Sequence, residues 1–164
     1  MMVARLLTGA VSFALMLCTQ DQGARPGRPL IDLRLASDTV ESGFLPMRAP
    51  SDTIFYVDRA HVVSDSDIQS ASVVLKKDGF LLIQARLTPS AMSRYDTVVK
   101  QHVGERLAII LDGQFLGAPI IVGPPPPNTQ PSSDPYVDIS VQLADSTARR
   151  IKALIIARWP AHSH

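Results

Sequence analysis

The dipeptide Asp112-Gly113, set between two apolar stretches, constrains the fold of this chain more than any other feature. A two-residue hairpin turn requires a positive φ at both positions, which Asp and Gly tolerate. The apolar run 107–111 predicts a strand buried on both faces, and residues 114–122 are predicted to return as its antiparallel partner. Because Pro119 has no N–H to donate, this second strand is expected at a sheet edge or with a bulge.

Other segments alternate apolar and polar residues, as half-buried strands do, or are rich in β-branched residues, and both patterns predict strands. The pair Asp78-Gly79 predicts a turn between two of them. Residues 37–53 hold two prolines and are predicted to be a loop. The further predicted strands are 30–35, 54–63, 72–75, 80–87 and 137–143.

Three segments carry helix signals, in which a capping residue precedes the helical stretch. In the middle segment Thr88 can cap, and Pro89 suits the first helical position because its missing N–H would be unpaired there. Gly104 suits the C-terminal stop of the same helix. Together the elements predict an α+β domain, a mostly antiparallel sheet with two or three packed helices. The predicted helices run over about 64–71, 88–102 and 145–158.

The N-terminus has the order of a secretory signal. Arg5 and the α-amino group supply positive charge before an uncharged apolar run at 6–17, which is shorter than the ~20 residues that span a bilayer. We therefore expect export, with the protein periplasmic or membrane-anchored and facing the outside. Cys18 ends the run and is the expected lipid attachment site, although Leu17 is larger than the small residue usual before a lipidated cysteine. Cleavage without lipidation and an uncleaved anchor remain alternatives.

The composition then divides the chain into parts. Residues 1–18 are expected to be a signal peptide or lipoprotein signal, and 19–50 a tether with a first short strand. Residues 51–160 are the expected domain, in which 123–135 form an exposed proline-rich loop. Residues 161–164 are expected to be a disordered tail.

The sequence offers no assembled set of reactive groups. A net charge of +1 and 5% aromatic residues argue against nucleic-acid binding. No HExxH, CxxC, GxSxG or phosphate-loop motif occurs, so no metal, cofactor or catalytic residue is predicted and the chain is expected not to be an enzyme. Asp58, His61 and Ser64 lie three apart, but on a strand this spacing places neighbouring members on opposite faces.

Residues 104–121 (GERLAIILDGQFLGAPII) resemble the first periplasmic head domain of the SecD/SecDF protein-export subunits. In that family a glycine precedes a LAIVLDG-like strand and turn, and the next strand ends in a small residue and a proline. The corresponding positions here include Gly104, Asp112, Gly113 and Pro119. Shorter motifs at 67–71, 87–91 and 145–154 extend the resemblance over about 55–158.

The resemblance implies a SecD-head-like fold with ferredoxin-like elements and a capacity to bind polypeptides. It does not imply a translocation motor, because the membrane helices of that family are not found after residue 18. Two local departures are the prolines at 124–127 and Val141, which stands where the family has a glycine.

The leading hypothesis is a non-catalytic exported module that binds a protein or an extended polypeptide, which an edge strand holding Phe115, Leu116 and Ile120 could accept by β-addition. It predicts an apolar groove beside an unpaired strand. A structural accessory lipoprotein of the envelope would instead present a flat apolar patch. A hydrolase with an unrecognised site would hold a buried polar cluster in a cleft.

Overall fold

The computed structural model describes residues 28–76, 79–123 and 136–160. The predicted signal segment with Cys18, most of the predicted proline-rich loop and the predicted C-terminal tail lie outside the described residues. The elements in chain order are β1 (Ile31–Ser37), β2 (Leu45–Arg48), β3 (Ile54–Val57), the 3₁₀ turn η1 (Asp65–Asp67), β4 (Ile68–Leu75), β5 (Phe80–Leu87), α1 (Pro89–Gln101), β6 (Arg106–Leu111), β7 (Gln114–Gly117), β8 (Tyr136–Gln142) and α2 (Asp145–Arg158).

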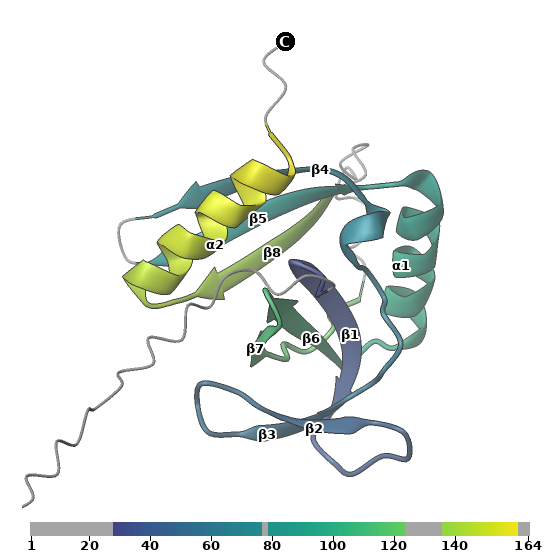
Figure 1. Ribbon diagram of the computed structural model, residues 1–164. Helices are drawn as coiled ribbons and strands as arrows, with labels where there is room; N and C mark the ends of the chain where they lie inside the picture. The colour runs from purple at the N-terminus through teal and green to yellow at the C-terminus, as the bar shows by residue number, and fades with distance from the viewer. Residues whose placement is uncertain (1–27, 77–78, 124–135, 161–164) are drawn as a thin grey trace, which may run out of the picture.

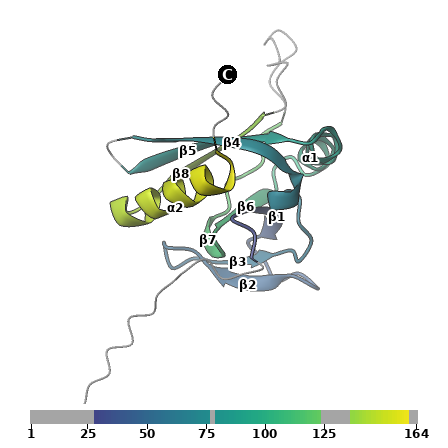
Figure 2. The ribbon, with the colours of Figure 1, turned by 45° about the horizontal axis from the view of Figure 1, so that its top comes forward.

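The strands form two antiparallel sheets, one of five strands in the order β2-β3-β1-β6-β7 and one of three in the order β4-β5-β8. In Figure 1 the three-stranded sheet is the upper part of the molecule, β1, β6 and β7 lie below it, and β2 and β3 cross at the bottom. Figure 2 shows α2 on the inner side of the three-stranded sheet. This arrangement confirms the predicted α+β class.

The main core lies between the two sheets and the helices. The alternation predicted for residues 80–87 is confirmed, because Leu81, Ile83, Ala85 and Leu87 are all at most 1% exposed. Helix α2 adds the buried side chains of Ala148, Ile151 and Ile155. The three-stranded sheet therefore buries one face, and its other face carries the polar residues of the same strands.

A second cluster covers the opposite face of the five-stranded sheet. The β2–β3 hairpin folds across β1 and β6 and contributes Met47, Phe55 and Val57. Strand β6 is consequently buried on both faces, as its continuous apolar sequence predicted: Ile109 and Leu111 face the main core, and Ala108 and Ile110 face the second cluster.

The central hairpin has the predicted geometry. Asp112 (φ 50°) and Gly113 (φ 72°) both take positive φ between β6 and β7. Gly104 (φ 89°) lies just beyond the end of α1, as a helix stop requires. Strand β7 ends at Gly117, earlier than predicted, after a register shift opposite Ile109.

Three local predictions were wrong because pairing between strands, and not the local signal, decides where these segments are extended. The helix predicted over 64–71 is the short turn η1 followed by β4, since residues from Ile68 onward pair with β5. The predicted loop 37–53 contains β2, in which Pro46 is tolerated because β2 is an edge strand. The strand predicted over 54–63 ends at Val57.

The first short strand predicted at 30–35 within residues 19–50 is β1. It lies between β3 and β6 and pairs with β6 along six residue pairs. The backbone N–H groups of Leu30 and Ile31 also donate to the Asp65 carboxylate, each at 2.9 Å. The segment 30–37 is therefore part of the folded unit.

Asp67 links η1 to α1 and has a perturbed pKa. Its carboxylate accepts hydrogen bonds from the Ser64 backbone N–H and from Arg94, both at 2.8 Å. Burial acts to raise the pKa of Asp67, but these hydrogen bonds and the Arg94 charge together outweigh burial and lower the pKa below 3.8.

Asp67→Asn is expected to lower the free energy of unfolding by about 1–2 kcal/mol at neutral pH. Because folding lowers this pKa, the contribution of the carboxylate is present above pH 3.8 and is lost as the pH falls through the lower value of the folded state. Urea unfolding over a pH series should show the difference between wild type and variant shrinking in acid. A difference that stays constant down to the most acidic point would contradict this account.

Candidate functional site

Strand β8 is an edge strand with an open side. It pairs with β5 from Phe80–Gln142 to Arg86–Tyr136. No strand pairs with its other side within the described parts of the chain. An open strand edge presents backbone N–H and C=O groups with which a further strand can pair.

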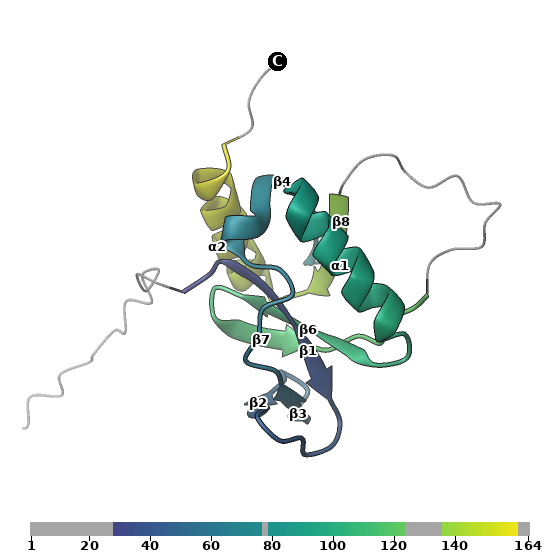
Figure 3. The same cartoon turned by 90° about the vertical axis from the view of Figure 1, so that its right-hand side faces the viewer.

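An apolar groove of about 320 Å³ runs beside this open edge. Its floor comes from β1 and β6, one wall is β8, a second wall is α1, and the third is the segment that follows β7. Figure 3 shows α1, β8 and the chain after β7 on one side of the molecule. The lining residues are Leu33, Tyr95, Val99, Leu107, Ile109, Pro119, Ile120, Ile121, Val122, Val137, Asp138, Ile139 and Ser140.

The third wall is held in place by the residues after α1. The Gly104 backbone N–H donates to the Ile121 carbonyl at 2.9 Å, and the Ile121 N–H donates to the Glu105 carbonyl at 2.7 Å. The Leu107 N–H donates to the Pro119 carbonyl at 2.9 Å. Pro119 therefore accepts a hydrogen bond where it cannot donate one, and the positive φ of Gly104 lets the chain turn into this pairing.

Large apolar side chains are exposed around the groove. Val103, Ile120, Val122 and Tyr136 are 52%, 55%, 77% and 43% exposed. Ile120 and Val122 line the groove, and Tyr136 begins the strand that forms its wall. Exposed apolar residues that gather at a concave site are typical of binding surfaces.

Two lining residues can bear charge, Tyr95 and Asp138. Burial raises the pKa of Tyr95, and the nearby Asp96 charge adds to the effect. Its hydroxyl is therefore neutral at ordinary pH and can donate a hydrogen bond to a ligand.

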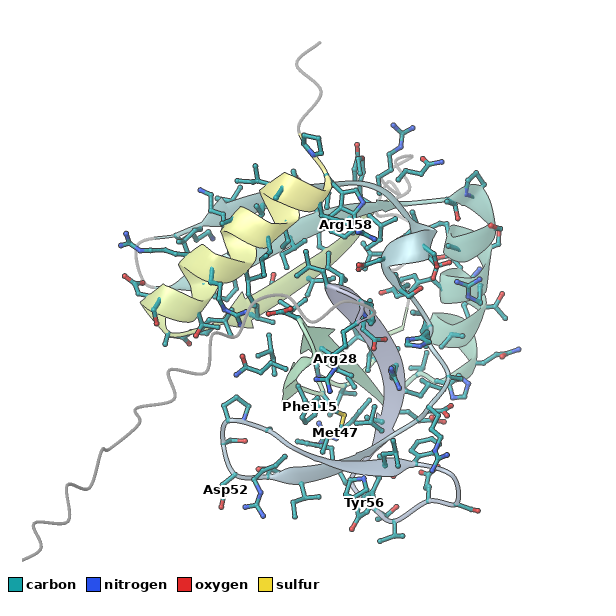
Figure 4. All side chains as sticks on the ribbon, viewed as in Figure 1. Arg28, Met47, Asp52, Tyr56, Phe115 and Arg158 are labelled. Carbon is teal, nitrogen blue, oxygen red and sulfur yellow. The ribbon has the colours of Figure 1, made fainter. Side chains whose placement is uncertain are left out.

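The structure separates the three residues predicted to form the binding edge. Phe115 is 4% exposed and packs edge-on against Phe55, with 5.7 Å between ring centroids. Figure 4 places it near Met47 in the second cluster. Leu116 packs against the main core, and Ile120 alone lines the groove.

Sequence reasoning missed the edge of β8. Residues 137–140 alternate like any half-buried strand, and nothing local shows that one side of β8 is unpaired. Tyr95 and Val99 of α1 also line the groove.

The turn residues Asp112 and Gly113 have structural roles. The Asp112 carboxylate forms an ion pair with Arg150, which joins the β6–β7 turn to α2. An added Cβ at Gly113 would lie 3.0 Å from the Arg28 guanidinium.

Asp58, His61 and Ser64 do not form a triad. The His61 Nδ1 bonds to Asp32 at 2.7 Å, and Asp58 instead accepts from the Ala60 backbone N–H. The Ser64 hydroxyl bonds to Ser66 and Asp67. Among residues 28–76, 79–123 and 136–160 no three His, Cys, Asp or Glu side chains are grouped as a metal site.

None of the helices in the described part of the chain is long and apolar enough to cross a membrane. Two antiparallel sheets, two packed helices and an apolar groove at an open strand edge define a small α+β domain. The family described as SecDF, P1 head subdomain, matches residues 42–155. The chain belongs to this family.

Two curated relatives are similar over part of the chain. The protein translocase subunit SecDF of Thermus thermophilus is 32% identical over 60 residues, which is 37% of this chain and 8% of that protein. The protein translocase subunit SecD of Aquifex aeolicus is 31% identical over 67 residues, which is 41% of this chain and 13% of that protein. The matched region is thus a small part of each relative.

Two solved structures have a similar fold at 19% identity, each with a TM-score of 0.51. One is SecDF in a super-membrane-facing form, with 80% of this chain and 19% of that chain covered. The other is described as a membrane component SecDF that enhances protein export, with 84% and 69% covered. These similarities confirm the SecD-head-like fold.

Proposed function

We propose that this chain is a non-catalytic head that binds extended polypeptides in the groove beside β8 and acts with protein-export machinery outside the cytoplasm. The observation that carries the proposal is the coincidence of an open strand edge with an apolar groove. A strand that adds to β8 would satisfy its own backbone groups and place alternate side chains in the groove. The names of the relatives, protein translocase subunits, support the export context.

The proposed location follows from the N-terminal sequence. A basic segment followed by an apolar run would direct the chain to the membrane and either anchor or release the head. Lipidation at Cys18 is the anchoring form of this proposal. Because only residues 19–30 separate the expected leader from β1, an anchored head would act close to the membrane surface.

The groove is tested by placing a charge on its rim. Ile120→Asp in the full chain is expected to weaken binding of a fluorescein-labelled peptide of alternating Val and Lys at least about tenfold, because the bound peptide would bury the new carboxylate. Ile120 is 55% exposed, so the fold should be retained. Fluorescence anisotropy measures the binding, and circular dichroism checks the fold.

The matched control is Ile156→Asp, which changes a similarly exposed isoleucine (49%) on α2 outside the groove. It is expected to alter binding less than about twofold. If both variants weakened peptide binding equally, or if neither weakened it, the groove would be rejected as the binding site.

A further inference from the structure

Asp138 is the one carboxylate among the described residues that line the groove. It lies in the middle of β8, opposite Gln84 of β5, and its side chain is on the exposed face of the sheet. Aspartate is unfavourable in strands, so its presence at this position calls for a reason. A charge on an edge strand can discourage indiscriminate pairing with other strands.

The Asp138 carboxylate has no partner in the described structure. It forms no ion pair or side-chain hydrogen bond with residues 28–76, 79–123 or 136–160. Arg86, two residues after Gln84 on β5, lies opposite Tyr136 and forms no ion pair with Asp138. No Lys or Arg is among the described residues that line the groove.

On this basis, and given the proposed function, we propose that Asp138 determines specificity: it selects extended segments with a lysine or arginine opposite it and rejects acidic ones. In a strand added to β8, the residue opposite Asp138 shares its face, where a cross-strand pair of opposite charges is favourable and a pair of like charges is unfavourable. The residues on either side of that position would point inward beside Val137 and Ile139, which are 5% and 3% exposed. The preferred segment is therefore apolar–basic–apolar.

The test compares two labelled peptides of alternating valine with lysine or with glutamate at the polar positions, bound to the full chain. Wild type is expected to bind the lysine peptide about five- to tenfold more tightly, with a smaller ratio at high salt. Asp138→Asn should bring the ratio below about threefold, and Asp138→Lys should reverse the preference. Glu41→Gln, which neutralises an exposed acid in the loop between β1 and β2, should leave the ratio unchanged.

The outcomes separate this inference from the function on which it rests. If wild type binds neither peptide, the proposed polypeptide binding fails. If wild type binds both equally, or if Glu41→Gln lowers the ratio as much as Asp138→Asn, binding stands and the role of Asp138 is overturned.

Discussion

Asp32→Ala is expected to lower the free energy of unfolding by about 3 kcal/mol, because it removes a buried carboxylate that bonds to the side chains of Arg34 and His61. Asp32 is 2% exposed. Its oxygens accept from Arg34 Nε at 2.9 Å and contact His61 Nδ1 at 2.7 Å. Urea unfolding near neutral pH measures the loss.

The comparison for Asp32 is Arg48→Ala, which breaks an exposed ion pair with Asp52. Its side chain is 62% exposed and its partner 81%, so water replaces the lost contact and stability should hardly change. The contrast between the two variants tests whether burial gives the Asp32 network its strength. A similarly small loss for Asp32→Ala would show that Arg34 and His61 find other partners.

Ile83→Ala is expected to lower the free energy of unfolding by about 3–4 kcal/mol. Ile83 is fully buried at the centre of β5 and lies between Val73 of β4 and Ile139 of β8. The substitution would leave a cavity behind the wall of the groove, so peptide binding should weaken as well. Chemical unfolding and peptide anisotropy on the same sample measure both effects.

The control for Ile83 is Val74→Ala on the exposed face of the same sheet. Val74 is 54% exposed, and its truncation should change stability by less than about 0.5 kcal/mol. If the two variants lost similar stability, the assignment of one buried and one exposed face to the three-stranded sheet would be wrong.

Elements specified by nearby residues were predicted well. Thr88 caps α1 by accepting from the Ala91 backbone N–H, and Pro89 begins the helix. Strand β5 has the predicted bounds, and Asp112-Gly113 forms the predicted turn. In each case the signal and the structure it produces lie within one short segment, so no distant partner could change the outcome.

Elements that depend on distant partners were predicted poorly. Ser64 and Asp67 predict the start of a helix. The segment from Ile68 onward instead pairs with β5, because this pairing stabilises it more than a short helix would. Pro46 predicts a loop, but it lies in the edge strand β2, where the N–H that proline lacks is not needed by a second neighbouring strand.

The sequence by itself determined the α+β class, most of the strands and helices, and a family resemblance that the comparisons confirmed. Only the tertiary structure decided that one edge of β8 has no strand partner among the described residues, that the groove lies beside this edge, and that Phe115 is buried while Ile120 is exposed. The physical reason is that alternation reports which face of a strand is buried. Which edge of a strand is paired depends on hydrogen bonds between segments far apart in the chain.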